Sequence, residues 1–190
     1  MQHRFKYICP NAPLLLKGVD KLSSFMRHVE KLSTDSAWTL NNWTPDEYKG
    51  DALEALVEVL VKYSPIDKRI NIVEYRPHDN KVDGPDMGID GYGISHNGNL
   101  HTVQVKYRSN VQKDLTANED HISNFVAKTT SSPKYRDADM TIFTTAKDLN
   151  QKVSESMYHD RVRVLGYKDL SKLVDGNVPF WNAFRAEMGC

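Results

Sequence analysis

With 190 residues, the chain has the length of one ordinary domain and can bury a hydrophobic core without disulfides. Hydrophobic residues make up 39% of it and charged residues 26%, and no stretch approaches the roughly 20 apolar residues that cross a bilayer, so no membrane-spanning segment is expected. The 25 lysines and arginines equal the 25 aspartates and glutamates, which excludes an overall basic excess but does not exclude a basic face.

The N-terminal residues and the two cysteines indicate the cellular compartment in which the protein is expected. Pro10, Asn11 and Pro13 interrupt the apolar residues near the start before they can form a signal-peptide helix. Cys9 and Cys190 have no metal-ligand spacing, and two cysteines are too few for a disulfide framework. We therefore expect a protein of a reducing compartment, the cytoplasm of a microbe or of the host cell of a virus.

Two helices are predicted first. From Gly18 to Leu32, apolar residues recur at three- and four-residue steps, the period of an amphipathic helix. Thr44-Pro45-Asp46-Glu47 then offers an N-cap residue, a proline at the first helical position and acids near the positive helix end. This second helix should end before Pro65, because the residue that precedes a proline is disfavoured in the helical region.

Three strands are predicted next. Ile70 to Tyr75 and Met87 to Ser95 have strand character, and the stretch His78 to Asp86 between them is rich in loop-forming residues. Residues 96–99 contain Asn-Gly, which readily takes the positive φ angles of a tight hairpin. A third strand, Leu100 to Arg108, should therefore pair with the second.

The rest of the chain alternates helix and strand. The predicted order is a helix over 117–129, a strand over 140–145, a helix over 149–158, a strand over 162–165 and a helical tail through Trp181 and Phe184. Together with the first half, this order predicts an α/β sandwich.

Four polar side chains from separate segments form a candidate metal site. Gln104 and Lys106 should project from the same face of their strand, while Val105 points the other way. The hairpin places Asp90 on the adjacent strand, and Glu54 lies in the middle of the long helix.

The chemistry of these groups suits a hard divalent cation. Magnesium takes one or two carboxylates, here Asp90 and Glu54, and the Gln104 side-chain oxygen and the Val105 carbonyl could add neutral ligands. Lys106 would then lie beside an attacked phosphate, where an ammonium can orient or help deprotonate water and stabilise developing negative charge. Each residue alone also has a structural explanation: a solvated helix glutamate, an aspartate in a turn and the polar face of an edge strand.

The same residues carry a family resemblance. Gly50-Asp51-Ala52-Leu53-Glu54, Met87-Gly88-Ile89-Asp90-Gly91 and Val103-Gln104-Val105-Lys106-Tyr107 resemble the PD-(D/E)xK nuclease superfamily, and more narrowly its Mrr-like branch, in which glutamine replaces the second acid of the motif. The resemblance runs from about Gly50 to Leu173. It implies a restriction endonuclease-like α/β/α sandwich with a central mixed sheet, formed by residues 50–190, with residues 1–49 as a helical extension packed on that core.

The resemblance also assigns roles. It implies that Asp90 binds the metal, that Gln104 occupies the second ligand position, that Lys106 is the catalytic lysine and that Glu54 is the helix glutamate that joins the metal shell. Pro85-Asp86 has the letters of the motif, but the Gly-x-Asp context favours Asp90. The implied cofactor is Mg²⁺ or Mn²⁺, and a neutral amide at position 104 binds a cation less strongly than a carboxylate.

The expected function is metal-dependent hydrolysis of DNA in restriction, recombination or replication. Tyr107, Arg108 and Lys113 are candidates for contacts with DNA, and a solvated strand end is the alternative for them. Two other functions stay open: a nuclease fold that has lost catalysis and serves as a DNA-binding or assembly module, and the nuclease domain of a helicase-nuclease. Expected partners are DNA, a second copy of the chain and a helicase or other DNA-processing protein.

Overall fold

A computed structural model of the chain describes residues 16–34, 44–64, 67–83, 88–117, 121–150 and 161–189. Its helices are α3 (Leu22–Ser33), α4 (Pro45–Tyr63), α5 (Asn80–Asp83), α6 (Ile122–Ser131), α8 (Tyr167–Val174) and α9 (Val178–Met188). Its strands are β1 (Glu74–Pro77), β2 (Gly91–Ile94), β3 (Leu100–Lys106), β4 (Asp139–Thr144) and β5 (Val162–Leu165). None of the described helices is long and apolar enough to cross a membrane.

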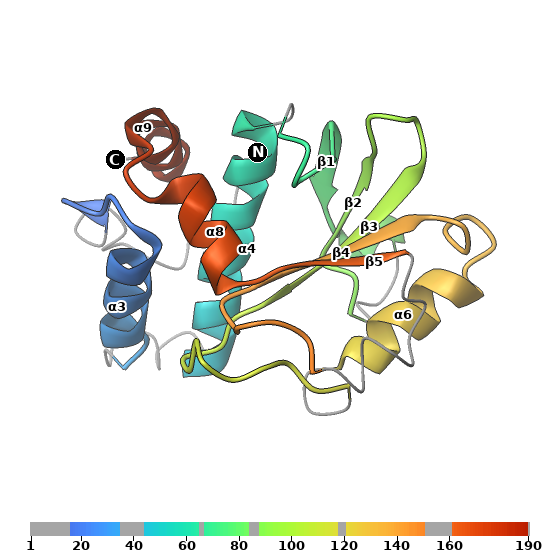
Figure 1. Ribbon diagram of the computed structural model, residues 1–190, viewed down its shortest axis with the longest axis horizontal. Coiled ribbons are helices and arrows are strands. Elements are labelled where there is room, and N and C mark those ends of the chain that lie inside the picture. The colour runs from blue at the N-terminus through green and yellow to red at the C-terminus, as the bar shows by residue number, and fades with distance from the viewer. Residues whose placement is uncertain are drawn as a thin grey trace.

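The strands form one sheet in the order β1-β2-β3-β4-β5. The pairs β1–β2 and β2–β3 are antiparallel, whereas β3–β4 and β4–β5 are parallel, so the sheet is mixed. Helices α3, α4, α8 and α9 lie on one side of it and α6 lies on the other (Figure 1). The predicted α/β/α sandwich with a central mixed sheet is confirmed.

Helix α4 begins as its sequence predicts. The Thr44 side chain accepts a hydrogen bond from the Glu47 backbone N–H, the Glu47 carboxylate accepts one from Thr44, and Pro45 occupies the first turn. The helix ends at Tyr63, and the Ser64 backbone N–H donates to Leu60. Because α4 contacts the sheet as well as α3 and α9, ten of its side chains are buried and it forms the centre of the larger layer.

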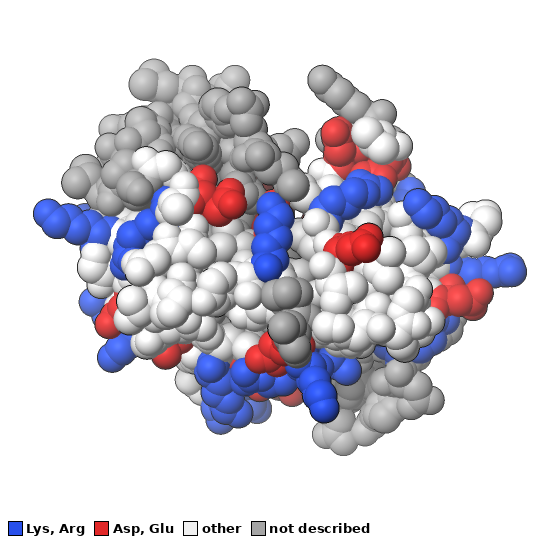
Figure 2. Space-filling model, turned by 90° about the horizontal axis from the view of Figure 1, so that it is seen from above, with Lys and Arg blue, Asp and Glu red and all other residues white. Residues whose placement is uncertain are grey.

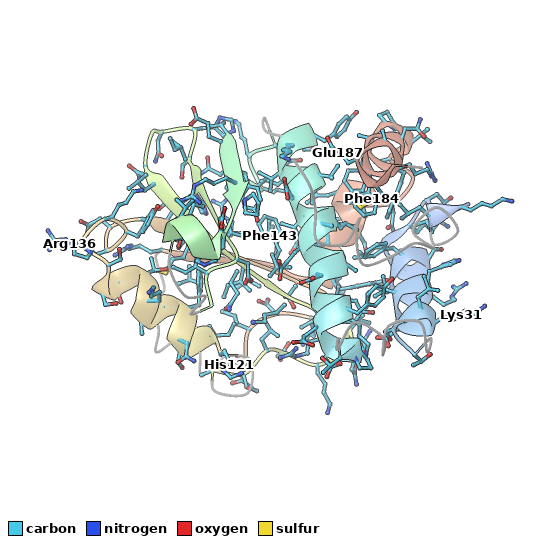
Figure 3. All side chains as sticks on the ribbon, turned by 180° about the vertical axis from the view of Figure 1, so that it is seen from behind. Lys31, His121, Arg136, Phe143, Phe184 and Glu187 are labelled. Carbon is cyan, nitrogen blue, oxygen red and sulfur yellow. The ribbon has the colours of Figure 1, made fainter. Side chains whose placement is uncertain are left out.

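The sheet separates two hydrophobic cores. The larger core lies between the sheet and α3, α4, α8 and α9, and it contains a cluster of rings in which Phe25 meets Trp181 and Phe184 with centroids 6.2 and 5.8 Å apart. The smaller core lies against α6. Figure 3 shows Phe184 on the helical side and His121 at the start of α6, across the sheet from it. Both faces of the central strands are therefore covered.

Several elements differ from the sequence prediction. Strand β2 covers only Gly91–Ile94 of the strand predicted over 87–95, so Asp90 directly precedes the strand that was expected to contain it. Strand β1 spans Glu74–Pro77 instead of residues 70–75, because Asn71 has a φ of 54° and turns the backbone, although Ile70 and Ile72 are fully buried. Helix α6 starts at Ile122 instead of residue 117. The single-turn helix α5 lies in the stretch predicted as a loop.

The C-terminal half differs in two further places. The helical tail consists of two helices, α8 and α9, and the second begins where the Asn177 side chain accepts a hydrogen bond from the Phe180 backbone N–H. Of the helix predicted over 149–158, Leu149 pairs with Leu115 in an isolated bridge, and residues 151–160 lie outside the described part. The predicted hairpin at 96–99 is confirmed: Gly98 has a φ of 85°, and the Ser95 N–H donates to Asn99 across the turn.

A buried histidine makes the stability of this sheet dependent on pH. His101 Nδ1 lies 3.0 Å from Ser95 Oγ and its Nε2 lies 2.7 Å from Thr141 Oγ1, while Ser95 donates to Asp139 at 2.9 Å. Burial lowers the pKa of His101 to about 4. The unfolded chain, with a histidine pKa near 6.5, therefore binds a proton that the folded chain excludes between those two values.

We expect the free energy of unfolding to be highest above pH 6.5 and to fall as the pH drops from 6.5 towards 4. The slope from this one group should reach about 1.4 kcal/mol per pH unit. Urea unfolding of the wild type and of His101→Asn at several pH values measures it. The slope in this window should be shallower in the variant, and equal slopes would contradict the assignment to His101.

Candidate active site

A cleft of about 880 Å³ lies between the first half of α4 and the end of β3. Charged side chains line most of it, and carboxylates outnumber the basic groups. The lining residues are Asp46, Glu47, Lys49, Gly50, Asp51, Glu54, Asp90, Val105, Lys106, Tyr107, Arg108 and Ser109. This concave, polar surface brings together segments that lie more than 50 residues apart in the sequence.

Helix α4 supplies Glu54 to one wall of the cleft. Ala52, Leu53 and Leu56 are fully buried in the larger core, and this packing fixes the rotation of the helix. Glu54 is consequently half-buried at the cleft, with Asp51 one turn before it on the same side.

Asp90 is held against the opposite wall by the backbone of β3. Its N–H donates to the Val103 carbonyl at 2.9 Å, and its Oδ2 accepts a hydrogen bond from the Val105 N–H at 2.6 Å. A short hydrogen bond to an ionised acceptor is among the stronger ones, so the carboxylate has a fixed position one residue away from Lys106 along β3.

The pKa of Tyr75 reflects both its burial and the carboxylates near it. Burial, followed by the negative charges of Glu54, Asp90 and Glu58, raises the pKa of the Tyr75 phenol well above its usual value. The ring occupies space that Gly91 leaves free, since a Cβ there would lie 2.4 Å from the Tyr75 oxygen. Acids from α4 and from the start of β2 therefore lie within electrostatic reach of one buried group.

Lys106 is the last residue of β3 and is half-buried in the cleft wall. Its carbonyl accepts a hydrogen bond from Thr144 Oγ1 at 2.7 Å, and the next turn is fixed by the Arg108 N–H, which donates to Thr145 Oγ1 at 2.6 Å. Within the described part of the chain, no ion pair involves the Lys106 ammonium. The strand end is anchored on β4, and Lys106 belongs to the cleft lining.

Gln104 is placed differently from these residues. Its side chain is 0% exposed and does not line the cleft, and its neighbour Thr102 hydrogen-bonds Thr129 of α6 on that face of the sheet. Neither amide atom of Gln104 has a hydrogen-bond partner among the described residues, and a Cβ on Gly88 would lie 3.2 Å from its Nε2. The structure thus brings Glu54, Asp90, Val105 and Lys106 to one cleft without the Gln104 side chain, whose role as a ligand stays a prediction.

The three candidate DNA contacts also differ in position. Tyr107 is 7% exposed, and its hydroxyl donates to Glu30 of α3 at 3.0 Å. Arg108 lines the cleft and donates to the Tyr107 carbonyl at 2.7 Å. Lys113 is exposed and lies outside the cleft lining. The alternative aspartate of the motif, Asp86, falls outside the described residues.

The donor set fits magnesium or manganese better than zinc. In the described part of the chain, no group of three or more histidine, cysteine, aspartate or glutamate side chains is arranged to hold an ion. Magnesium does not need such a group, because one or two carboxylates with water and substrate phosphate complete its shell. Glu54, Asp90 and Val105 all belong to the cleft lining, and the two carboxylates with the Val105 carbonyl provide oxygen donors of that kind.

Sequence patterns did not identify several residues in or beside the cleft. Asp51 could have been found, because it precedes Glu54 by three residues and so shares its side of the helix. Tyr75, Lys49 and Glu30 gave no signal, since their roles depend on contacts with residues far away in the sequence.

Comparison with known families assigns most of the chain. A family model described as restriction endonuclease matches residues 64–186, which is more than half of the chain. The matched region contains Asp90, Gln104 and Lys106, whereas Glu54 and α3 precede it. No curated protein matches the chain.

Proposed function

We propose that this chain, a nuclease domain of the restriction endonuclease family in its Mrr-like branch, hydrolyses DNA phosphodiester bonds. The proposed reaction depends on Mg²⁺ or Mn²⁺ and takes place at the cleft between α4 and β3. The observation that carries the proposal is the 2.6 Å hydrogen bond between Asp90 and the Val105 N–H, which fixes a carboxylate next to Lys106. Glu54 faces the same cleft from α4.

In this proposal Glu54, Asp90 and the Val105 carbonyl hold the ion. A bound Mg²⁺ or Mn²⁺ would neutralise charge on the scissile phosphate and make a water more acidic. For Gln104 to become a further ligand, as its place in the motif implies, its buried amide would have to leave the face covered by α6.

Lys106 acts on the reacting groups. Its positive charge orients the attacking water, favours release of the water proton to solvent and stabilises the extra negative charge of the transition state. The water oxygen forms a new bond to phosphorus, the bond to the leaving strand breaks, and the leaving oxygen takes up a proton. Thr144 anchors the Lys106 backbone, so the side chain extends from a fixed point of the cleft wall, which supports a role in positioning and charge stabilisation.

DNA would contact basic residues of the cleft lining. Arg108 lines the cleft beside Lys106 and offsets part of the repulsion between the carboxylates and a phosphate backbone, whereas Lys49 is paired with Glu30 and Asp46. Lys113 would extend this contact beyond the cleft. Seen from above, the molecule carries lysines and arginines interspersed with acids on a largely uncharged surface, so the basic residues drawn there do not form one patch (Figure 2).

The biological setting is part of the proposal. A DNA nuclease of this family suits restriction, recombination or replication in a microbe or a virus, in the cytoplasm. A homodimer with two clefts would make paired cuts, whereas a single copy would nick or trim DNA, alone or together with a helicase or another DNA-processing protein.

A panel of labelled linear, circular, single-stranded and four-way-junction DNAs tests the function. We expect cleavage of at least one form with Mg²⁺ or Mn²⁺, loss of cleavage in EDTA, and recovery when the metal is restored. DNA binding that ignores the metal, with no cleavage of any form, would instead support the DNA-binding module and contradict the proposal.

A further inference from the structure

One carboxylate of helix α3 contacts three residues of the cleft. Glu30 Oε1 accepts a hydrogen bond from the Tyr107 hydroxyl at 3.0 Å and another from the Ser109 hydroxyl, and its Oε2 lies 3.3 Å from the Lys49 ammonium. All three partners line the cleft, whereas Glu30 itself belongs to the part of the chain that precedes the family match. Figure 1 shows α3 next to the half of α4 that carries this cleft.

These contacts connect the two walls of the cleft. Lys49 lies one and a half turns before Glu54 on α4, and Tyr107 and Ser109 follow Lys106 at the end of β3. Tyr107 is almost fully buried, and the side chain of Lys49 is 15% exposed, so these two contacts are partly shielded from water. A change at Glu30 would therefore be transmitted to both walls.

The carboxylate is in its charged form at neutral pH. Burial raises the pKa of Glu30, but the hydrogen bonds from Ser109, Tyr107 and Lys49 outweigh it, and the net result is a lowered pKa. A single exposed ion pair would contribute little. Three donors from two other elements on one carboxylate form a network, in which the loss of the shared acceptor affects all three.

We propose that Glu30 is a positioning residue that holds the end of β3 against the start of α4 and so sets the separation of Lys106 from Glu54. The inference rests on the proposed function of these two residues in catalysis. It makes the helical extension before residue 50 a part of the active site and not only a cover of the core.

Glu30→Gln tests the inference, because glutamine keeps the size of the side chain but loses the ion pair and part of the accepting capacity. We expect kcat to fall about tenfold while KM for DNA changes less than about threefold, since Glu30 acts on geometry and does not contact DNA. The control is Glu187→Gln on α9, which removes the same charge from an exposed acid (Figure 3) and should leave kcat unchanged. Assays are run well below the Tm of each variant.

Tyr107→Phe and Ser109→Ala each remove one donor. Each should lower kcat by about threefold, and Glu30→Gln combined with Tyr107→Phe should be no slower than Glu30→Gln alone, because both changes act on one network. A lowered Tm with unchanged kcat in Glu30→Gln would overturn the inference, since Glu30 would then only stabilise the fold. A change in KM alone would also overturn it.

Hydrogen exchange separates this inference from the proposed function. In the metal-free protein without DNA, Glu30→Gln should speed the exchange of backbone amides 107–110 relative to those of β4. This result is expected whether or not the protein cleaves any DNA of the panel. Unchanged exchange in this segment would reject the positioning role even if the wild type is an active nuclease.

Discussion

Asp90→Asn should reduce DNA cleavage about a thousandfold, a loss of roughly 4 kcal/mol of transition-state stabilisation, without unfolding the protein. The side-chain oxygen of asparagine can still accept the hydrogen bond that the Val105 N–H donates at 2.6 Å. The end of β3 therefore keeps its geometry, and the variant removes the negative charge that a divalent cation requires.

Single-turnover cleavage at saturating Mg²⁺ measures this effect, and thermal unfolding checks that the fold is retained. Asp137→Asn is the matched control, because Asp137 loses the same charge in an exposed turn with a side chain that is 89% exposed. Cleavage by Asp90→Asn within about tenfold of the wild-type rate would exclude Asp90 from the metal shell.

Lys106→Gln is expected to lower kcat by about 100- to 1,000-fold, the usual effect of removing one group that stabilises transition-state charge. KM for DNA should change much less, because Arg108 remains in the lining of the cleft. Lys106→Arg separates the tasks of the ammonium, because arginine keeps the positive charge but has another shape and takes no part in proton transfer. Full recovery of kcat would indicate charge stabilisation alone, and partial recovery would indicate a further role in orienting or deprotonating the water.

Steady-state kinetics on one substrate compare these variants with Lys168→Gln. Lys168 is exposed on α8 and does not line the cleft, so its loss matches the charge change and should leave kcat unaltered. A Lys106→Gln protein that cleaves DNA at the wild-type kcat would show that the ammonium has no part in the chemistry.

The sequence predicted the elements whose ends are encoded by local chemistry. The capping residues Thr44 and Glu47 locate the start of α4, and Asn97-Gly98 locates the hairpin that brings Asp90 next to β3. These signals are local because they depend on backbone hydrogen bonds within three or four residues. The hairpin places Asp90 beside β3, whereas its meeting with Glu54 in one cleft also requires that α4 pack on the sheet.

Strand β1 shows where a pattern of burial is insufficient. Ile70 and Ile72 alternate and are buried, as a strand would require, but the positive φ of Asn71 prevents a regular ladder there. Pairing with β2 starts only at Glu74. Alternating apolar residues indicate which side chains face the core, but they do not indicate which backbone groups form hydrogen bonds with a neighbouring strand.

Gln104 and Glu30 depend on tertiary packing that no local pattern contains. Alternation predicts the face of Gln104 but not that α6 covers this face and encloses the amide. Glu30 resembles a solvated residue on an amphipathic helix, and its partner Tyr107 lies 77 residues further along the chain. Contacts over such distances are set by how α3 packs on α4, which the helical period leaves open.

The central claim is that Glu54 and Asp90 hold one divalent ion beside Lys106, and crystals soaked in Mn²⁺ and measured at the manganese absorption edge test it most directly. We predict one anomalous peak within metal-ligand distance of both carboxylates, and its loss in the Asp90→Asn protein. A peak at any other place in the molecule, with the cleft between α4 and β3 empty of manganese, would contradict the proposed site.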